Sequence, residues 1–188
     1  MTDTTPEPFT AYLDFLGGTL DPERKVVERR LSDLRGMFLE DPEDDSDPVM
    51  YRVSYAPVPE TGSDIVYCTT VLQPGRVGRE YYMTRGHFHA VRDRAEVYIG
   101  LAGQGLLVLA TEDSGHRVEP IRSGTVSYVP GGWAHRSVNV GGEPLVFFAA
   151  FVGDAGQDYD TIERRGFPVV VLAREDGPEV AQNPRYRR

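Results

Sequence analysis

The sequence predicts an all-β protein, an antiparallel sandwich or barrel that follows one amphipathic helix near the N-terminus. From Met50 onward, short apolar segments alternate with turn-forming residues, and no helical pattern separates them. Many short strands at such spacing are typical of antiparallel sandwiches and barrels. Before that region, apolar residues recur at helical spacing over residues 23–38.

The expected strands are short and bounded by Gly, Pro, Asn, Asp and Ser. They lie near residues 50–56, 64–71, 80–85, 96–101, 105–110, 117–121, 125–129, 136–139, 144–152 and 168–173. Turn signals such as Pro-Gly at 74–75, Asp-Ser-Gly at 113–115 and Pro-Gly-Gly at 130–132 separate most of them. The sequence contains no internal repeat, so we expect one continuous set of strands.

The predicted helix has its own start signals. Asp21 suits the N-cap, Pro22 the first helical position, and Glu23 adds an acid to the first turn. The expected apolar face consists of Val27, Leu31, Leu34 and Phe38. We expect this face to pack against the strands that follow.

A chain of 188 residues fits one domain with a substantial hydrophobic core. We expect it to divide into an N-terminal arm and helix (1–49), a β-barrel (50–173) and a polar surface tail (174–188). Residues 1–20 are turn-rich and suggest an extended lead-in. Residues 40–47, EDPEDDSD, suggest a solvated acidic loop.

Composition excludes several classes of partner. A formal net charge of -9 argues against nucleic acids, whose binding needs clustered Lys and Arg. No stretch approaches the roughly 20 apolar residues that span a bilayer. The first ten residues lack a basic start followed by an apolar run, so we expect no secretory signal. Cys68 is the only cysteine, which rules out an intrachain disulfide and favours the reducing cytoplasm.

Three of the four histidines fall into two short patterns. Residues 86–89 read GHFH and are followed after a short loop by Glu96, and His135 ends the pattern PGGWAH. Side chains two apart on a strand share a face, so His87 and His89 point together into a barrel. Three imidazoles and one carboxylate form an open site that suits Fe, Mn, Zn, Ni or Co. We expect the three histidines and Glu96 to bind one divalent ion.

The alternative is that these histidines are ordinary surface or core residues. An acid at hairpin distance and a further His after a Pro-Gly turn, in an all-β context, favour the metal site. The fourth histidine, His116, lies next to a Ser-Gly turn, and we expect it to be solvent-exposed there. We expect Phe88 and Trp133 to serve packing rather than substrate binding.

Two stretches, residues 86–98 and 130–139, resemble the two conserved motifs of cupins. Over almost its whole length the chain is similar to the archaeal-type cupin phosphoglucose (glucose-6-phosphate) isomerases. The resemblance also takes in RRLSD at 29–33, TTVL at 69–72 with Pro-Gly at 74–75, DAG at 154–156 and NPR at 183–185.

The resemblance implies a cupin double-stranded β-helix, or jelly-roll barrel, and a homodimeric enzyme of glycolysis and gluconeogenesis. It implies one divalent ion per subunit, Fe, Mn, Ni or Zn, with the ligands His87, His89, Glu96 and His135. Glu96 and Tyr98 are the expected catalytic residues. Thr70, Thr84 and Gly86 are expected to hold the phosphate of a sugar phosphate, and Tyr51, Tyr98 and Tyr159 to line the sugar pocket. Arg85 and Gln157 are further candidates for substrate binding.

Interconversion of glucose 6-phosphate and fructose 6-phosphate moves a hydrogen between adjacent carbons. A divalent ion near both oxygens polarises the carbonyl and stabilises an enediolate. Glu96, the only acid in the motif, can shuttle the proton, but a bound ion lowers its pKa and weakens it as a base. A hydride shift needs no base. Both routes remain open.

The sequence departs from the family pattern at three positions near the expected pocket. Gln157 stands where the family has His, Phe151 where Tyr is usual, and Gly132 where a bulkier residue precedes Trp133. Gln cannot titrate near neutral pH. Two other functions therefore remain open. One is a cupin enzyme on another small molecule, such as a different sugar phosphate isomerase or epimerase or an iron dioxygenase; the other is a non-catalytic sugar-phosphate-binding cupin.

Overall fold

The largest element of the fold is a six-stranded antiparallel sheet with the strand order β11-β8-β13-β5-β4-β3. The computed structural model describes residues 7–43 and 45–187. The strands of this sheet are β3 (Lys25–Arg30), β4 (Val49–Tyr55), β5 (Ile65–Leu72), β8 (Glu96–Ala102), β11 (Val126–Val129) and β13 (Leu145–Val152). The apolar and β-branched sequences of β5 and β13 suit their central and largely buried positions.

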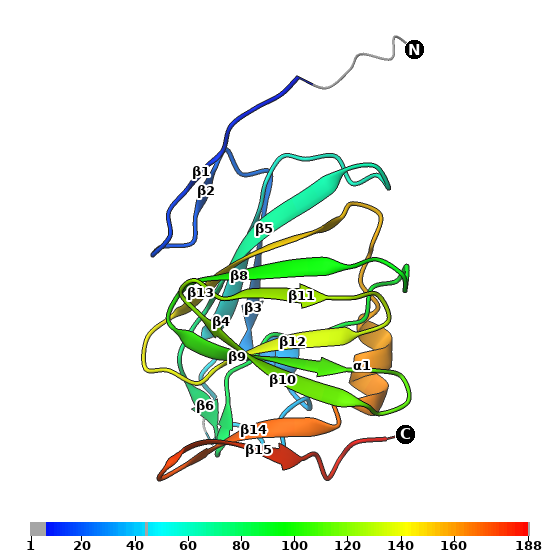
Figure 1. The fold of residues 1–188 in the computed structure, drawn as a ribbon. Coiled ribbons are helices and arrows are strands. Elements are labelled where there is room, and N and C mark those ends of the chain that lie inside the picture. The colour runs from blue at the N-terminus through cyan, green and yellow to red at the C-terminus, as the bar shows by residue number, and fades with distance from the viewer. Residues whose placement is uncertain (1–6, 44, 188) are drawn as a thin grey trace.

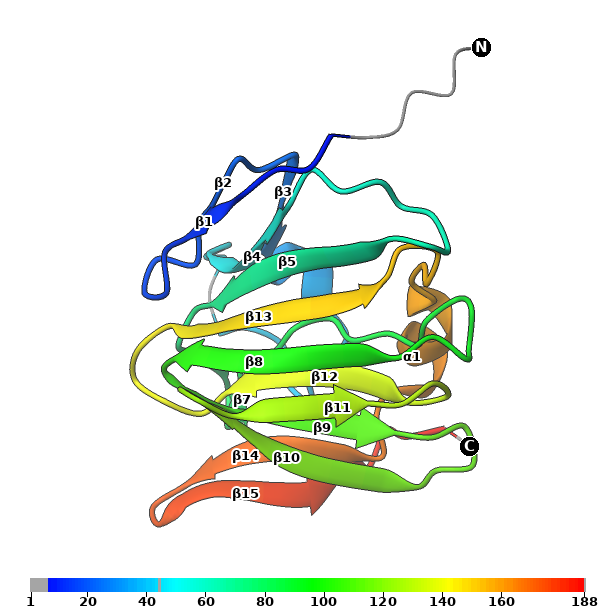
Figure 2. The same cartoon turned by 45° about the horizontal axis from the view of Figure 1, so that its top comes forward.

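Two smaller antiparallel sheets complete the barrel. One has the order β10-β9-β12 and the other the order β15-β14-β7-β6. Their strands are β6 (Arg76–Val77), β7 (Glu80–Tyr81), β9 (Gln104–Ala110), β10 (His116–Arg122), β12 (Ala134–Asn139), β14 (Val169–Arg174) and β15 (Gly177–Gln182). β10 also contacts β8 of the large sheet, so the sheets close on one another along that side (Figure 2).

The sheets enclose one apolar core, which gives a β-barrel (Figure 1). Strands β4, β5, β8, β9, β12 and β13 all contribute buried side chains to it. The only α-helix among the described residues, α1 (Tyr159–Arg165), packs beside one end of the barrel. A short hairpin of β1 (Tyr12–Leu13) and β2 (Leu20–Asp21) extends from the large sheet on the other side.

All ten predicted strands are present in the predicted order, and the described part of the chain adds five strands that were not predicted, β1, β2, β3, β6 and β15. Each of the ten expected segments contains a strand of the structure, with ends that differ by one or two residues in most cases. The segment 80–85 differs most, because only β7 at its start is a strand. An isolated bridge from Met83 to Val138 continues the pairing beyond it.

The predicted helix over residues 23–38 is wrong. Residues 25–30 form β3, an edge strand paired with β4, and a 3-10 turn, η1 (Leu31–Leu34), follows it. The β-branched pair Val26-Val27 favours a strand, and pairing with β4 supplies the backbone hydrogen bonds that a helix would otherwise supply. Leu31, Leu34 and Phe38 are buried as expected, but η1 and the loop after it deliver them to the core.

The segment predicted as a polar tail, residues 174–188, contains a strand. It includes β15, which pairs with β14, and the side chains of β15 alternate between half-buried and exposed positions. The sequence reading also missed α1. This helix starts at Asp158, whose carboxylate accepts a hydrogen bond from the backbone N–H of Thr161 at 3.1 Å.

Parts of three predicted segments lie outside the described residues. These are positions 1–6 of the expected lead-in, position 44 of the acidic loop and position 188 of the tail. The rest of that loop forms neither helix nor strand, and Asp47 accepts a hydrogen bond from the backbone N–H of Ser32 at 2.7 Å. No helix in the described part of the chain has the length and apolar character needed to cross a bilayer.

Candidate metal centre and substrate pocket

The segment with His87 and His89 lies next to the start of β12, which carries His135, and the two are hydrogen-bonded to each other. His87 and His135 form an antiparallel bridge, in which the N–H of His87 donates to the carbonyl of His135 at 3.2 Å and the reverse bond measures 3.0 Å. Gly86 makes this approach possible with a φ of +74°. A Cβ at Gly86 would lie 2.7 Å from the Phe167 ring and 3.1 Å from the carbonyl oxygen of His135.

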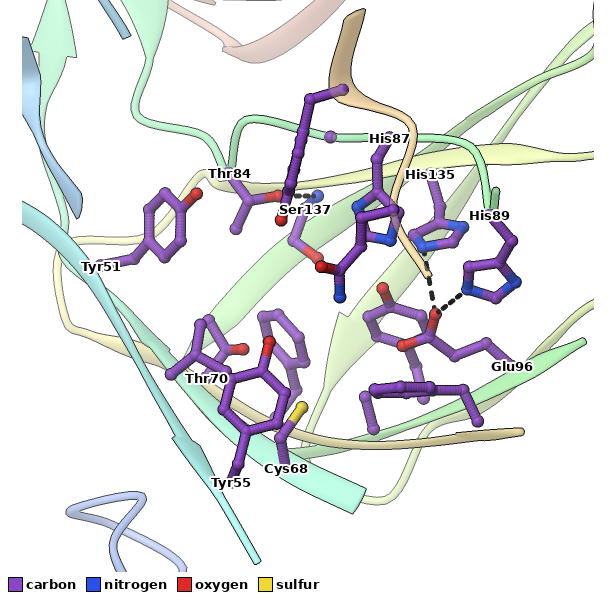
Figure 3. A pocket seen from close by; sticks show the side chains of 18 residues that line it. Tyr51, Tyr55, Cys68, Thr70, Thr84, His87, His89, Glu96, His135 and Ser137 are labelled. Carbon is purple, nitrogen blue, oxygen red and sulfur yellow. Dashed lines mark hydrogen bonds and ion pairs between the residues drawn. The ribbon is translucent and has the colours of Figure 1, made fainter. Parts of the chain in front are cut away.

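Four side chains from three segments converge inside the barrel (Figure 3). His87 and His89 come from the segment before β8, Glu96 is the first residue of β8, and His135 is the second residue of β12. One ligand atom from each lies within 4.8 Å of all the others. His89, Glu96 and His135 are at most 5% exposed. This arrangement can hold a metal ion.

The hydrogen bonds at the centre orient the imidazoles toward a shared cation. His89 Nδ1 lies 2.8 Å from the carbonyl oxygen of Arg94, an acceptor, so this nitrogen carries the proton when the ring is neutral. His89 Nε2 then presents its lone pair to Glu96 Oε2 at 3.1 Å. His135 Nε2 lies 3.1 Å from the same oxygen but makes no hydrogen bond. A cation bound by all three groups would satisfy these facing lone pairs.

Electrostatics favour the protonation states that metal binding needs. Burial raises the pKa of Glu96, but the charge of the nearby His135 and the hydrogen bond with His89 outweigh burial and lower it. Burial and the charge of His135 lower the pKa of His87 well below its ordinary value. For His89, burial lowers the pKa, but the hydrogen bond to Glu96 outweighs it and raises the pKa. A bound cation would instead lower the pKa of His89, because its positive charge disfavours the protonated ring.

A pocket of about 600 Å³, part of it open to solvent, leads to the four converging groups. The structure brings eleven of the twelve predicted site residues to its wall. They are Tyr51, Thr70, Thr84, Gly86, His87, His89, Glu96, Tyr98, His135, Gln157 and Tyr159. The Tyr159 ring lies 5.3 Å from the His87 ring, so the start of α1 forms part of the pocket.

Arg85 is the exception, because its side chain does not line the pocket. Its guanidinium stacks over the Tyr159 ring at 4.4 Å and forms an ion pair with Glu163 on α1. The backbone N–H of Arg85 lies 3.4 Å from the Tyr51 hydroxyl. Arg85 therefore supports the pocket wall from behind rather than facing a bound molecule.

Sequence reasoning missed several pocket residues. They are Val53, Tyr55, Cys68, Ser137, Phe147 and Ala149. Each lies two positions from another lining residue on the same strand, as Ser137 does from His135 and Cys68 from Thr70. Because alternate residues share one face of a strand, this spacing would have identified them.

Tyr98 lies next to the converging groups on β8, two residues after Glu96, and is 7% exposed. Burial raises the pKa of its hydroxyl well above the ordinary value, and the charge of Glu96 and a hydrogen bond to it act in the same direction. The phenol therefore remains protonated at neutral pH. It provides a proton donor beside the carboxylate.

Other positions singled out from the sequence have mixed outcomes. Phe88 is buried and Trp133 packs against the core, as expected. His116 is half-buried at the start of β10, not in an exposed turn. Phe151 lines the pocket, with its ring 6.2 Å from that of His89. Gly132 has a φ of +82°, and a Cβ there would meet no atom within 4 Å.

Comparisons with known proteins match almost the whole length of the chain. The family model described as "Glucose-6-phosphate isomerase (GPI)" matches residues 28–187. The glucose-6-phosphate isomerase of Pyrococcus horikoshii is 45% identical over 186 residues, which cover 96% of this chain and 98% of the relative. The same enzyme of Pyrococcus furiosus is 42% identical over 97% of this chain and 98% of the relative.

A bacterial relative and a solved structure extend the comparison. The glucose-6-phosphate isomerase of Sinorhizobium medicae is 39% identical over 85% of this chain and 78% of the relative. The match to a solved structure of a mutant of the Bacillus subtilis oxalate decarboxylase covers 63% of this chain and 29% of the decarboxylase chain. Its sequence identity is 24% and its TM-score 0.46. The family match over residues 28–187 and the full-length relatives carry the conclusion: this chain belongs to the glucose-6-phosphate isomerase family.

Proposed function

We propose that this protein is a metal-dependent aldose–ketose isomerase that interconverts glucose 6-phosphate and fructose 6-phosphate in glycolysis and gluconeogenesis. The observation that carries the proposal is the convergence of His87, His89, Glu96 and His135 at a pocket, in a chain that matches isomerases along almost its whole length. These four residues would hold one divalent ion, Fe, Mn, Ni or Zn. When bound, such an ion polarises the sugar carbonyl and stabilises negative charge that develops on its oxygen.

Glu96 and Tyr98 are the proposed catalytic residues. Glu96 is ionised, and one of its carboxylate oxygens, Oε2, faces both His89 and His135. In the proton-transfer route, this carboxylate moves a proton between the two adjacent carbons of the open-chain sugar. The Tyr98 hydroxyl, which stays protonated, donates a hydrogen bond to the carboxylate or to a sugar oxygen. In the hydride-shift route, the same two residues only position the substrate.

The phosphate of the substrate would bind to donors on the pocket wall. Thr84 Oγ1 accepts a hydrogen bond from the backbone N–H of Ser137 at 3.0 Å, so its hydroxyl hydrogen is free to point at an anion. Thr70 and the backbone of Gly86 line the same pocket. Because Arg85 is paired with Glu163, hydroxyl and backbone donors would carry most of this recognition.

The sugar would lie among the aromatic side chains of the pocket. Tyr51 and Tyr159 line the wall, and Gln157 can donate and accept hydrogen bonds there. Burial raises the pKa of Tyr51 to about 12, so its hydroxyl is a donor at neutral pH. Uncharged donors of this kind suit the hydroxyl groups of a sugar.

The organisation of the active protein completes the proposal. We propose a homodimer of single cupin domains, each spanning residues 1–188, with one metal ion per subunit. A buried, unpaired Cys68 fits the reducing cytoplasm, where sugar phosphates are metabolised.

A coupled assay tests the function. Chelator-stripped protein is supplied separately with Fe²⁺, Mn²⁺, Ni²⁺ and Zn²⁺, and conversion of fructose 6-phosphate to glucose 6-phosphate is followed through a dehydrogenase that consumes the product. We expect turnover with at least one metal and none with the stripped protein. The variant His116→Gln, which changes the one histidine outside the centre, should remain active. Absence of turnover with all four metals would contradict the proposal, and binding of the sugar phosphate without turnover would indicate a non-catalytic cupin.

A further inference from the structure

A groove on the outside of the barrel is lined by five arginines. It encloses about 1460 Å³, including space open to solvent, between α1, the segment after β15 and the loop after η1. The arginines are Arg136, Arg164, Arg165, Arg185 and Arg187. We call this feature the arginine groove. This local concentration of positive charge contrasts with the net charge of -9 for the whole chain.

Carboxylates do not neutralise the charges in the arginine groove. Three of its guanidinium groups donate to main-chain carbonyls instead. Arg136 donates to Arg85 at 2.7 Å, Arg165 to Glu112 at 2.7 Å, and Arg185 to Phe38 and Leu39 at 2.8 Å each. A carbonyl satisfies a hydrogen bond but leaves the positive charge uncompensated. The groove therefore keeps a positive potential.

Several arginines elsewhere on the molecule form ion pairs with carboxylates. Within 7–43 and 45–187, the arginines that form ion pairs are Arg24, Arg52, Arg85, Arg92, Arg94 and Arg174, and none of them lines the groove. Glu163 does line the groove, but it pairs with Arg85. The buried Glu80 influences Arg136 and Arg185 through its charge, without an ion pair to either. One buried acid against five arginines leaves an excess of positive charge.

Arg136 gives a second and independent sign of a missing partner. It is only 6% exposed, and its Nε is buried without a hydrogen-bond acceptor. On β12 it lies between His135 and Ser137, which line the substrate pocket, so alternation turns Arg136 to the opposite face. A buried guanidinium with an unsatisfied donor is costly unless an anion binds nearby.

Arg164 and Arg187 provide an exposed part of the site. Both are exposed, and neither side chain makes a hydrogen bond or ion pair within the part of the chain that the structure describes. Guanidinium groups match the oxygens of phosphate in a two-point geometry. We propose that the arginine groove binds a small molecule that carries one or more phosphate groups, at a site separate from the pocket that holds the metal ligands.

An NMR titration of the zinc-loaded full-length protein tests this proposal, with inorganic phosphate as the probe and chloride at matched ionic strength as the reference. Backbone amides of Gly166 and Phe167 report on the groove, and that of Thr70, which lines the pocket but not the groove, reports on the substrate pocket. The test variant is Arg164→Gln with Arg187→Gln. The matched control is Arg122→Gln, which changes an exposed arginine on β10 that does not line the groove.

We expect the groove amides to shift with phosphate along a saturating curve in the wild type and in the control. In the double variant, the apparent Kd from those amides should rise at least tenfold, while the Thr70 response stays unchanged. Added salt should weaken the groove response, because screening acts on exposed charges. Shifts confined to Thr70, or groove shifts that survive in the double variant, would overturn the proposal. The outcome does not depend on isomerase activity, so failure of one proposal leaves the other standing.

Discussion

His87 and His135 face each other across an antiparallel bridge, with two backbone hydrogen bonds between them and ring centroids 4.5 Å apart. Because of the bridge, the backbones of His87 and His135 hold each other in place. The segment before β8 and β12 therefore present two imidazoles to the same point, and Glu96 closes the group from β8. This pre-positioned donor set is the basis of the first prediction.

Replacing His135 by Gln should abolish metal retention and activity while the barrel stays folded. The change removes one of four donors, and its neutral amide is a poor ligand for a transition metal. We expect metal content after dialysis to fall at least tenfold, measured by elemental analysis, with an unchanged far-UV circular dichroism spectrum. His116→Gln should retain the metal. Full metal content in His135→Gln would show that the ion lies elsewhere.

Gly86→Ala should destabilise the protein more than Gly132→Ala. Both glycines have a φ near +80°, so both substitutions carry the cost of a left-handed backbone, about 1 kcal/mol. Only at Gly86 does the new methyl group meet neighbours, at 2.7 Å from Phe167. We expect an additional loss of about 1–3 kcal/mol in the free energy of unfolding, from overpacking. Urea denaturation of the two variants gives the comparison, and equal losses would contradict it.

Short apolar segments between turn signals were enough to predict ten of the strands, and alternation indicated that His87 and His89 share a face. The same alternation places Ser137 on one face with His135, and Cys68 on one face with Thr70. The error at residues 23–38 has a different origin, because Val27 and Leu31 satisfy helical spacing while Val27 and Arg29 also satisfy the spacing of a strand. Pairing with β4, a tertiary contact, decided between the two.

The role of Arg85 was beyond sequence reasoning for a related reason. Its partner Glu163 lies 78 positions away on α1, a helix that was not predicted. Local patterns do not reveal which carboxylate neutralises a given arginine. The same limit hid the arginine groove, which is assembled from β12, α1 and the C-terminal segment.

Removing the metal should lower the thermal stability without unfolding the barrel. A ligand that binds only the folded state stabilises it by about 2.7 kcal/mol at a hundredfold excess over its Kd. In a chain of this size, that corresponds to a shift of about 5–10 °C in Tm. We expect this difference between zinc-loaded and chelator-treated protein in a thermal melt. His135→Gln should show no such difference, and a shift in that variant would indicate a binding site outside the proposed centre.

The ion pair between Arg92 and Asp158 should make stability depend on pH in the acid range. Asp158 Oδ2 lies 2.6 Å from Arg92 Nη2, and this contact is the main cause that lowers the pKa of Asp158 from 3.8 to about 2. A lowered pKa means that ionised Asp158 favours the folded state. Its contribution is therefore complete above about pH 4 and disappears as the pH falls through 2.

The variant Asp158→Asn isolates this contribution. It keeps a side-chain oxygen that can accept from the N–H of Thr161, but it loses the charge. The wild type should be more stable than the variant by about 1 kcal/mol at pH 7. The difference should shrink between pH 4 and pH 2 in urea denaturation. A constant difference over that interval would show that the charge of Asp158 adds nothing.

Tyr98→Phe should separate chemistry from metal binding. The hydroxyl of Tyr98 is buried beside Glu96 and stays protonated, whereas the ring packs against Phe147 at 5.3 Å and against His135 at 5.8 Å. Phe preserves this packing and removes only the donor. We expect unchanged metal content, a KM within about threefold of the wild type, and a kcat lowered about 10- to 100-fold, in the range for the loss of one proton donor. Because burial and Glu96 raise the pKa of Tyr98 well above 10, its ionisation should impose no loss of kcat below that pH in the wild type. A variant with normal kcat would limit Tyr98 to a packing role and leave the proton transfer to Glu96 alone.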